Sequence, residues 1–273
     1  MLASPLAVNR NLDDLAREVS RFVHCLSTPS LNDTTAMHST VAAMHALCVE
    51  LSLIPENQRE SEEVKRILVP AIGLHEQSPF VRRLRNWPRG YPGDFETVEL
   101  LVSGKPSIAS GGEGYWIEWY ALNTAIAQQH RNKINWQYLI MSAGLPKRIL
   151  SIGCGGGADF NVSPQTFTDY QIVLLDTDRA ALELASSRLG QYSLVDTIEG
   201  DAVRGLKRAL DLGPFDLVVC GGLFDYLPDR AIEFILSTVG AYGLRAGGSL
   251  IFTVTGMRPP PRGRAIDLRY SLA

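Results

Sequence analysis

Apolar residues recur at helical spacing through the first half of the chain. Between residues 12 and 26 they return every three or four positions, which predicts a helix with one buried face. Residues 34–54 are rich in Ala, Met and Leu and contain neither Gly nor Pro, so they predict a long, mostly buried helix. A third helix is expected over residues 60–69, where Pro70 would end it because proline lacks the next backbone donor.

A segment rich in proline and glycine follows, and then one more long helix. Residues 78–114 carry four prolines and six glycines and are predicted to be irregular. Residues 115–141 predict a helix, and the character of the chain changes near residue 146. We assign residues 1–114 to a helical region that ends in a loop, and residues 115–273 to a second domain.

Near-continuous apolar runs alternate with helical patterns in the second half. Helices are predicted over residues 179–189, between Asp178 as N-cap and Gly190, and over residues 229–242. The predicted strands are residues 148–152, 171–175, 195–198, 215–219 and 250–254. Apolar strands separated by helices indicate an α/β fold in which helices cover both faces of a parallel sheet.

Composition and charge exclude several classes of protein. With 45% hydrophobic and 20% charged residues over 273 positions, the chain is not expected to be disordered. The net charge of −3 gives no global basic field, so neither nucleic acid nor an anionic membrane is expected as a partner. No apolar run approaches 18 residues and the start lacks a signal-peptide pattern, so neither a spanning helix nor secretion is expected.

Cysteine and histidine spacing adds a cellular context. The four cysteines, Cys25, Cys48, Cys154 and Cys220, form no CxxC pair, which favours reduced thiols in a cytoplasmic protein. The five histidines are scattered without HxxxH or HExxH spacing, so no metal site is expected.

A glycine-rich turn directly follows the first predicted strand. Gly153, Cys154, Gly155 and Gly157 belong to this turn. Ligands of open parallel sheets bind outside the carboxyl ends of the strands, and glycine lets the backbone approach them closely. Taken alone, a glycine-rich turn that binds nothing stays a substantial alternative.

Acidic residues at the next two strand ends sharpen the prediction. Asp176 ends the second predicted strand, where a carboxylate accepts hydrogen bonds from both hydroxyls of a ribose. Asp201 follows the third strand and is suited to an adenine amino group, while the Ala202 N–H is suited to a ring nitrogen. Asp178 is better explained as the helix cap. Each acid alone is more often a solvated loop residue, but three ordered features at successive strand ends are unlikely to coincide by chance.

The glycine spacing separates two nucleotide cofactors. A dinucleotide site has the pattern GxGxxG and a helix that begins beneath the pyrophosphate. This chain has GxGxG followed by Ala158, and Pro164 makes the next segment a poor long helix. A ligand without pyrophosphate fits better. The pattern resembles motif one of the class I S-adenosyl-L-methionine (SAM)-dependent methyltransferases.

This resemblance implies a Rossmann-like class I methyltransferase sheet, an N-terminal helical region and SAM as cofactor. Asp176 and Asp201 match the ribose and adenine acids of the family, and Cys220, after the fourth predicted strand, joins the expected cofactor-binding residues. The family often has an acid two residues before the first glycine, where this chain has Ser151. Asp159 is the candidate substitute for holding the methionine ammonium.

Three further segments are similar to bacterial methyltransferases of the 3-hydroxypalmitic acid methyl ester synthase type. They are residues 89–96 (RGYPGDFE), 129–133 (QHRNK) and 220–230 (CGGLFDYLPDR). The similarity covers about residues 80–255. It implies an enzyme of bacterial secondary metabolism that acts on a small molecule, without implying a shared acceptor.

These segments supply the candidate catalytic residues. The turn around Tyr91 and Asp94 would lie over the cofactor and face the substrate, and a purely structural turn is an equal alternative. Tyr226 lies just past the fourth strand, where the family meets the transferring methyl, with a core tyrosine as the alternative. Arg131 is a candidate for the cofactor's carboxylate, and a solvated helix face is the slightly favoured alternative.

The expected function is SAM-dependent methyl transfer to a small-molecule acceptor, such as a carboxylate or a natural-product intermediate. A carboxylate is ionised at pH 7 and needs no base, whereas a hydroxyl or amine would need one, with Asp94 or Asp225 as candidates. Two alternatives stay open. One is an intramolecular cyclisation that releases methylthioadenosine, and the other is a SAM-binding protein without turnover.

The chain after the fifth predicted strand is short for this family. Nineteen residues remain, including the prolines at 259–261, whereas the family sheet ends in an antiparallel hairpin. The pattern predicts either abbreviated C-terminal strands or a truncated chain. The helical first half is interpreted mainly as core, with an apolar wall for the substrate and a homodimer surface as the alternatives.

Overall fold

The structure is a computed structural model of the 273-residue chain. It describes residues 5–28, 32–91, 93–111, 114–143 and 147–254, with side chains from residue 12 onward. The chain forms two compact units that divide between residues 128 and 129, and each unit is described by itself. The sequence placed the start of the second domain at Tyr115, and the observed division falls later, within a long helix.

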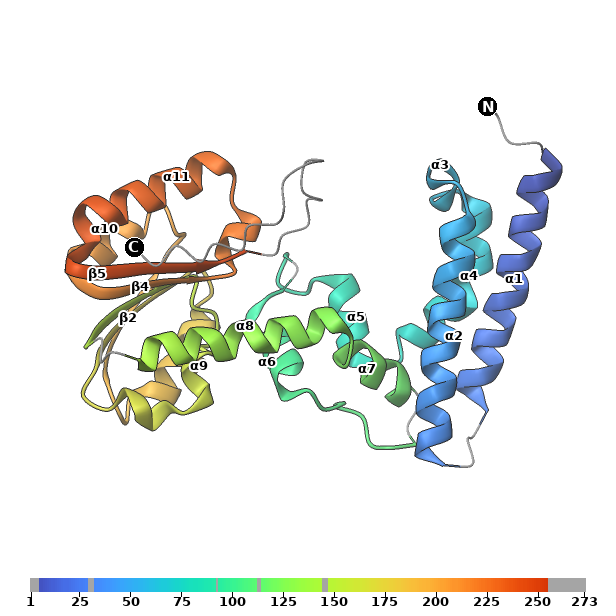
Figure 1. Cartoon of the computed structure of the whole chain (residues 1–273), viewed down its shortest axis with the longest axis horizontal. Coiled ribbons are helices and arrows are strands. Elements are labelled where there is room, and N and C mark those ends of the chain that lie inside the picture. Colours follow the sequence, from blue (N-terminus) through green and yellow to red (C-terminus); the bar gives the residue numbers. More distant parts are fainter. Residues whose placement is uncertain (1–4, 29–31, 92, 112–113, 144–146, 255–273) are drawn as a thin grey trace. The chain divides into compact units, whose positions relative to one another are not determined.

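The first unit is helical, as Figure 1 shows. Its helices are α1 (Pro5–Ser27), α2 (Asp33–Leu53), α3 (Glu56–Arg59), α4 (Glu62–His75), α5 (Pro79–Asn86), α6 (Phe95–Ser103) and α7 (Tyr115–Leu122). Helix α8 (Ala125–Ser142) crosses the division. The apolar stripe of α1 packs against α2 and α4, so Leu15, Phe22, Leu47 and Val64 share one core.

Helix α4 continues through Pro70, so the prediction that Pro70 ends it is wrong. The Ser61 hydroxyl caps the start by accepting a hydrogen bond from the Val64 N–H at 3.3 Å. Val64 and Ala71 are buried in the helical core on either side of the proline. Pro70 itself is exposed, so water can solvate the carbonyl that it leaves unpaired. Packing therefore keeps this helix intact beyond the proline.

Two helices lie in the segment that was predicted to be irregular. Helix α5 begins with Pro79 in its first turn, where the missing donor costs nothing, and Ser78 caps it. Helix α6 begins after Asp94, whose side chain is its N-cap. The proline and glycine content of residues 78–114 marks the ends of these helices and was wrongly taken to exclude them.

The single helix predicted over residues 115–141 is two helices, α7 and α8. The break lies at Asn123 and Thr124. The Asn123 N–H closes α7 by donating to Trp119, and the Thr124 hydroxyl accepts from the Ala127 N–H at 3.4 Å at the start of α8. A short polar side chain thus begins a new helix without a glycine or proline to signal it.

The second unit contains a five-stranded sheet of Rossmann-like topology. The strands are β1 (Arg148–Ile152), β2 (Gln171–Asp176), β3 (Leu194–Glu199), β4 (Phe215–Gly221) and β5 (Leu244–Thr253). Their order in the sheet is β3-β2-β1-β4-β5, and every neighbouring pair is parallel. The prediction of a parallel α/β sheet is confirmed. The order reverses between β1 and β4, which is where such sheets bind ligands.

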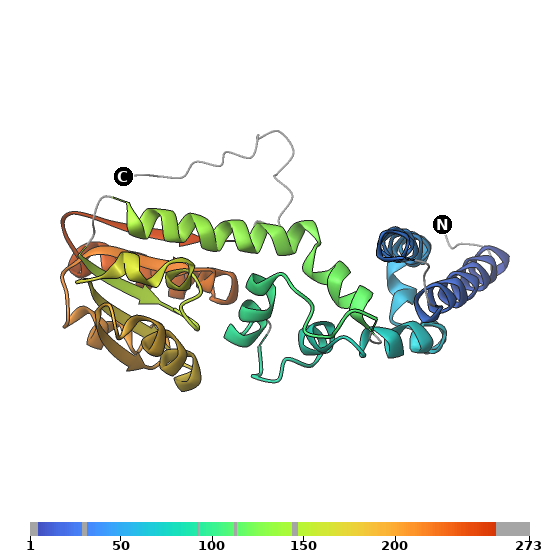
Figure 2. The same ribbon diagram turned by 90° about the horizontal axis from the view of Figure 1, so that it is seen from below.

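Helices cover both faces of this sheet, as seen in Figure 1. One face packs against α8 and α9 (Arg179–Leu189), together with the short turns η1 (Phe160–Val162) and η2 (Pro164–Phe167). The other packs against α10 (Leu206–Leu210) and α11 (Asp229–Thr238), together with η3 (Leu223–Tyr226) and the π turn η4 (Val239–Gly243). Figure 2 shows α8 running along its face of the sheet.

Several elements differ in extent from the prediction. The final turn of the predicted helix 229–242 is the separate π turn η4, and α10 was not predicted. Strand β4 runs on to Gly221, because Cys220 and Gly221 pair with Phe252 and Thr253 of β5. The C-terminal strands that were expected to be abbreviated would fall on residues 255–273, which lie outside the described residues.

Pro70→Ala should stabilise the helical unit. The substitution restores a backbone donor inside α4 at an exposed position, and we expect the free energy of unfolding to rise by about 2 kcal/mol. Thermal unfolding followed by circular dichroism measures this. The exposed neighbour Val69→Ala changes no backbone hydrogen bond and serves as the control. An unchanged or lower midpoint for Pro70→Ala would contradict this account of α4.

Candidate functional site

A glycine-rich loop follows β1 at the carboxyl edge of the sheet. Gly153, Gly155 and Gly157 have φ angles of +65°, +52° and +66°, which glycine adopts without strain. The Gly153 and Cys154 N–H groups donate to the Leu175 carbonyl oxygen, at 2.7 and 3.3 Å, and tie the loop to β2. The loop therefore presents bare backbone at the point where β1 ends.

Two of these glycines are also required by close packing. A Cβ on Gly157 would lie 3.1 Å from the Ala185 Cβ in α9, and one on Gly153 would lie 3.2 Å from the Leu223 side chain. The loop thus fits between α9 and the turn after β4. The contact between Gly153 and Leu223 shows that the loop after β1 and the turn after β4 lie side by side at the carboxyl edge of the sheet.

Asp176, the last residue of β2, organises the loop. Its Oδ2 accepts a hydrogen bond from the Gly155 N–H at 2.8 Å, and its Oδ1 accepts one from the Asp178 N–H at 3.0 Å. One carboxylate therefore holds the glycine loop and the start of α9 in a fixed relation. The predicted ribose acid lies at the expected strand end, directly beside the loop.

Asp178 is the N-cap of α9, which confirms the cap prediction. Its Oδ1 accepts from the Ala180 N–H at 2.9 Å and from the Ala181 N–H at 3.4 Å. Gly190 follows the last residue of the helix, although its φ of −61° is right-handed and any residue could adopt it. The two acids near the end of β2 thus have separate local contacts.

Asp201 and Ala202 follow β3 at the same edge. The Asp201 Oδ1 accepts from the Arg204 N–H at 2.9 Å and from the Val203 N–H at 3.0 Å. The Arg204 backbone donor, with smaller effects of the Val203 N–H and the Arg204 guanidinium, holds the pKa of Asp201 below its usual value. Ala202 is half-buried against the second core. Because β1, β2 and β3 are adjacent and parallel, their three predicted features share one edge.

Burial keeps the two thiols near the edge in their protonated form. Burial, with the nearby charges of Asp176 and Asp159, raises the pKa of Cys154 well above its usual value. Burial raises the pKa of Cys220 to about 12. Cys220 is also fully buried in the second core, so any contact that it makes with a ligand has to come from its backbone.

Asp159 is a buried acid beside the loop. It is 7% exposed, and its Oδ1 accepts from the Phe160 N–H at 3.0 Å. Burial raises its pKa from 3.8 to about 6, even though the Phe160 N–H opposes that shift. Ser151, where the family often has an acid, is buried within β1. Asp159 is thus an acid on the loop that lacks a cationic partner among the described residues.

Helix α8 covers the carboxyl end of β4. The Gln137 amide donates to the Thr253 hydroxyl at 3.1 Å, and a Cβ on Gly221 would lie 2.7 Å from that amide nitrogen. A Cβ on Gly222 would lie 2.9 Å from the Lys133 Nζ. Both glycines leave room for polar side chains that α8 directs onto the strand end.

Three titratable groups meet there. Burial and the Lys133 charge lower the pKa of His130, and the Asp225 carboxylate opposes the shift. Burial also lowers the pKa of Lys133, again opposed by Asp225. His130 is half-buried in this cluster.

Tyr226 and Arg131 lie in the same unit. Tyr226 ends η3 after β4 and is 53% exposed, so its phenol is open to solvent and not the core side chain of the alternative prediction. Arg131 is half-buried on α8, two residues before Lys133. Their predicted roles toward substrate and cofactor stay predictions.

Asp94 lies in the helical unit and is tied into its local structure. It is 1% exposed and accepts hydrogen bonds from the Thr97 N–H at 3.1 Å and from the Arg83 guanidinium at 2.6 Å. Although burial would raise the pKa of Asp94, Arg83 and Thr97 hold it below its usual value. A carboxylate of this kind is a weak base, and its predicted catalytic role stays a prediction.

The turn before Asp94 is only partly described. Tyr91 is half-buried and Gly93 has a φ of +71°, while Pro92 lies outside the described residues. Close by, Glu96 accepts from Arg89 at 2.6 Å, and the Arg89 guanidinium stacks 4.4 Å from the Phe95 ring centroid. The described residues of the segment RGYPGDFE thus lie around the start of α6, where Arg89 and Glu96 form an ion pair.

Sequence reasoning missed Lys133 and Gln137. The polar run on α8 was visible, but nothing in the sequence says which of its residues faces β4, because that depends on how the helix packs. A weak signal existed in the pair Gly221–Gly222, since adjacent glycines at a strand end leave space for a neighbouring side chain.

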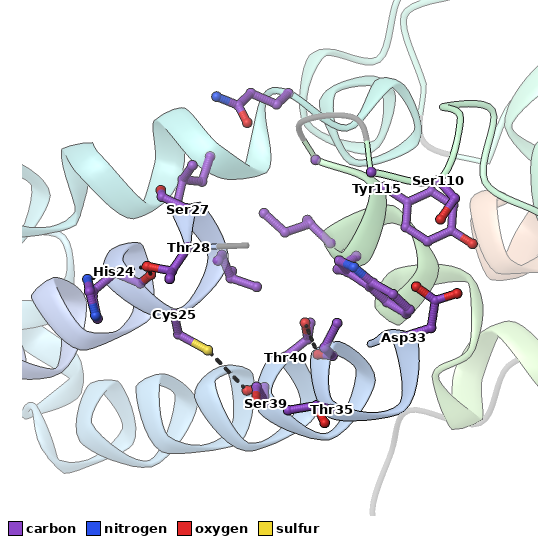
Figure 3. A pocket seen from close by; sticks show the side chains of 18 of the residues that line it. His24, Cys25, Ser27, Thr28, Asp33, Thr35, Ser39, Thr40, Ser110 and Tyr115 are labelled. Carbon is purple, nitrogen blue, oxygen red and sulfur yellow. Dashed lines mark hydrogen bonds between the residues drawn. The ribbon is translucent and has the colours of Figure 1, made fainter. Parts of the chain in front are cut away.

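The helical unit has a cavity of its own, shown in Figure 3. Its volume is about 840 Å³, and it is lined by residues of α1, α2 and α7 and of the loop before α7. Cys25 donates to the Ser39 carbonyl oxygen at 3.6 Å, and the Thr40 hydroxyl to the Ala36 carbonyl oxygen at 2.8 Å. Its lining mixes hydroxyl and amide groups with apolar and aromatic side chains, and Asp33 is its acidic residue among those described.

A metal site and a membrane-spanning helix are both absent from the described residues. No group of three or more His, Cys, Asp or Glu side chains there is placed to hold a metal ion. None of the described helices has both the length and the hydropathy to cross a bilayer.

Comparison with known proteins finds similarities to the second unit of the chain. Residues 150–250 match a family model described as a methyltransferase domain. A curated relative, the malonyl-[acyl-carrier protein] O-methyltransferase of Halalkalibacterium halodurans, is 26% identical over 111 residues, which are 41% of this chain and 40% of the relative. The chain thus matches less than half the length of that relative.

Some solved structures are similar to this chain, with low TM-scores. A possible exported protein from Bordetella parapertussis is 17% identical with a TM-score of 0.46, covering 92% of this chain and 73% of that one. Phosphoethanolamine N-methyltransferase 1 from Haemonchus contortus, in complex with phosphoethanolamine and S-adenosylhomocysteine, is 25% identical with a TM-score of 0.36. That match covers 49% of this chain and 28% of the other.

Asp159→Asn should stabilise the protein in a pH-dependent way. Because the folded pKa of about 6 exceeds the ordinary 3.8, the protonated acid stabilises the fold below about pH 4, and this contribution is lost as pH rises through 6. The amide keeps the Phe160 acceptor and stays neutral. We expect up to about 3 kcal/mol of added stability at pH 7.5 and almost none at pH 4.

Urea unfolding at both pH values tests this expectation. Asp211→Asn, which makes the same replacement at an exposed acid beside α10, is the control. Equal effects of Asp159→Asn at pH 4 and 7.5 would contradict the assignment of Asp159 as a carboxyl group whose ionisation destabilises the fold.

Proposed function

We propose a reaction for the class I SAM-dependent methyltransferase domain that this chain contains: it binds SAM at the carboxyl edge of the sheet and transfers the methyl group to a small-molecule acceptor. The observation that carries the proposal is the convergence of the glycine loop, Asp176 and Asp201 at the ends of three adjacent strands. The match of residues 150–250 to a methyltransferase family supports it.

The donor and acceptor groups at this edge suit an adenosyl ligand. Positive φ angles and close packing keep the loop free of side chains, so its backbone can lie against a nucleoside. Asp176 uses one acceptor position of Oδ2 for the glycine loop and one of Oδ1 for the Asp178 N–H before α9, which leaves further lone pairs for ribose hydroxyls. Asp201 and the Ala202 N–H lie one strand further along, where they would meet the adenine edge.

When bound, SAM supplies a methyl group that its sulfonium has already activated. The residues of the chain then have to hold the acceptor in line and exclude water. We propose that Tyr226, exposed just after β4, contacts the acceptor. Tyr91 belongs to the helical unit, and its role toward the acceptor stays a prediction. For Asp94 we propose instead that it fixes the start of α6 together with Arg83.

A carboxylate is the acceptor that we favour. A carboxylate is ionised at pH 7, so its methylation needs no catalytic base. Asp94, which was predicted as a base, is paired with Arg83, and this pairing makes it a weak one. The curated relative named above is an O-methyltransferase of malonyl-[acyl-carrier protein], which is consistent with this choice. A hydroxyl acceptor is the second candidate, because His130, whose pKa is lowered, could take its proton at the end of β4.

Product analysis tests the proposed reaction. We expect SAM labelled in its methyl group to yield S-adenosylhomocysteine and a base-labile methyl ester when 3-hydroxypalmitic acid or malonyl-acyl carrier protein is offered. The amide of 3-hydroxypalmitic acid, which lacks the carboxylate, is the control. Base-stable label would indicate a hydroxyl acceptor. Methylthioadenosine would indicate the cyclisation alternative, and bound SAM without turnover on any acceptor would indicate a regulator.

Asp176→Ala should weaken binding of S-adenosylhomocysteine by at least about thirtyfold, since it removes a charged acceptor. Because the same carboxylate organises the loop, a second ligand separates the two effects. The 2′-deoxy analogue should bind wild type more weakly than the parent, and Asp176→Ala should not distinguish the two. Calorimetry measures all four affinities, with Asp211→Ala as control. Equal discrimination by variant and wild type would contradict the ribose assignment.

A further inference from the structure

An ammonium group rests against the end of β4. The Lys133 Nζ would lie 2.9 Å from a Cβ on Gly222, so the missing side chain of this glycine is what makes room for it. Gly222 has a φ of +86° and begins η3. The lysine reaches this place from α8, whose next inward turn is fixed to β5 by the Gln137–Thr253 hydrogen bond.

This ammonium has unused hydrogen-bonding capacity. Within the described residues Lys133 makes no hydrogen bond and no ion pair. The charge of Asp225 affects the pKa of its ammonium without such a contact. Lys133 is half-buried, so part of its side chain stays open to a ligand at this edge. A half-buried lysine with three free donors is costly to desolvate unless it meets an anion.

The strand order shows which anion would arrive there. If the adenosine of SAM occupies the ends of β1, β2 and β3, its amino-acid arm extends past β1 toward β4, the neighbour on the other side. The turn after β4 touches the glycine loop, since Leu223 packs against Gly153 and directly follows Gly222. The lysine therefore lies one residue from the point where the two strand ends meet.

We propose that the Lys133 ammonium binds the α-carboxylate of the cofactor's amino-acid arm, in the space that Gly222 leaves open. The proposal rests on the proposed function. It replaces Arg131, the residue assigned to this carboxylate from the sequence. Residues 131 and 133 are two apart on α8 and point to different sides of the helix, and Lys133 is the one in contact with the strand end.

Three ligands isolate the carboxylate contact in a calorimetric experiment. S-adenosylhomocysteine carries both ammonium and carboxylate, its decarboxylated analogue keeps only the ammonium, and methylthioadenosine lacks the arm. We expect Lys133→Gln to weaken S-adenosylhomocysteine by at least about tenfold, as for a hydrogen bond to a charged group. The decarboxylated analogue and methylthioadenosine should bind the variant and wild type equally.

Two further variants complete the test. Lys207→Gln, an exposed lysine on α10, should bind all three ligands as wild type does. Gly222→Ala, which strains the backbone at a φ of +86° and also pushes the ammonium away, should weaken all three ligands, with the largest loss for S-adenosylhomocysteine. Equal losses for all three ligands in Lys133→Gln would mean that the lysine only supports the fold of the edge, and this would overturn the proposal.

The failure of this assignment can be told apart from the failure of the proposed function. If wild type binds S-adenosylhomocysteine and Lys133→Gln binds it with the same affinity, the lysine assignment alone is wrong. If wild type binds neither S-adenosylhomocysteine nor methylthioadenosine, the site is not a SAM site, and both proposals are overturned.

Discussion

The Asp176 carboxylate is the contact on which the candidate site depends. Its two oxygens accept from the Gly155 and Asp178 N–H groups, so a single side chain fixes both the glycine loop after β1 and the start of α9 after β2. Backbone amides at such a turn otherwise face water without a set direction. With this link in place, the loop, the acid and the helix start keep one geometry at the carboxyl edge of the sheet.

Local pattern predicted the strands of the second unit and the two long helices of the first, but not where the other helices begin and end. Buried parallel strands are continuous apolar runs, so β1 and β2 were located almost to the residue. The extra length of β4 comes from Cys220 and Gly221 pairing with β5, a contact between distant segments. In the helical unit the prolines led to wrong helix ends, because the effect of a proline depends on its position in a helix. Pro79 lies in the first turn of α5, and Pro70 lies on an exposed face of α4.

The same distinction explains which site residues the sequence could reveal. The loop glycines, Asp176 and Asp201 directly follow strands, so knowing the strands was enough to bring them to one edge. Lys133 reaches that edge from a helix, and only the packing of α8 on β4 selects it over Arg131. Asp94 shows the opposite case, in which a residue expected in catalysis has its carboxylate occupied by Arg83 and Thr97.

The distribution of charge along the edge argues for an adenosyl amino acid over a dinucleotide. Asp176 and Asp159 both flank Cys154 in the loop, and their charges help to raise the pKa of its thiol by disfavouring the thiolate. The same two acids would repel a pyrophosphate held by this loop, and more strongly than a thiolate, because a pyrophosphate carries more negative charge. A cationic sulfonium or ammonium would instead be attracted by these acids, while a carboxylate would find the half-buried Lys133 ammonium at the end of β4. The acids and the lysine thus offer separate places for the cationic and the anionic group of the proposed ligand.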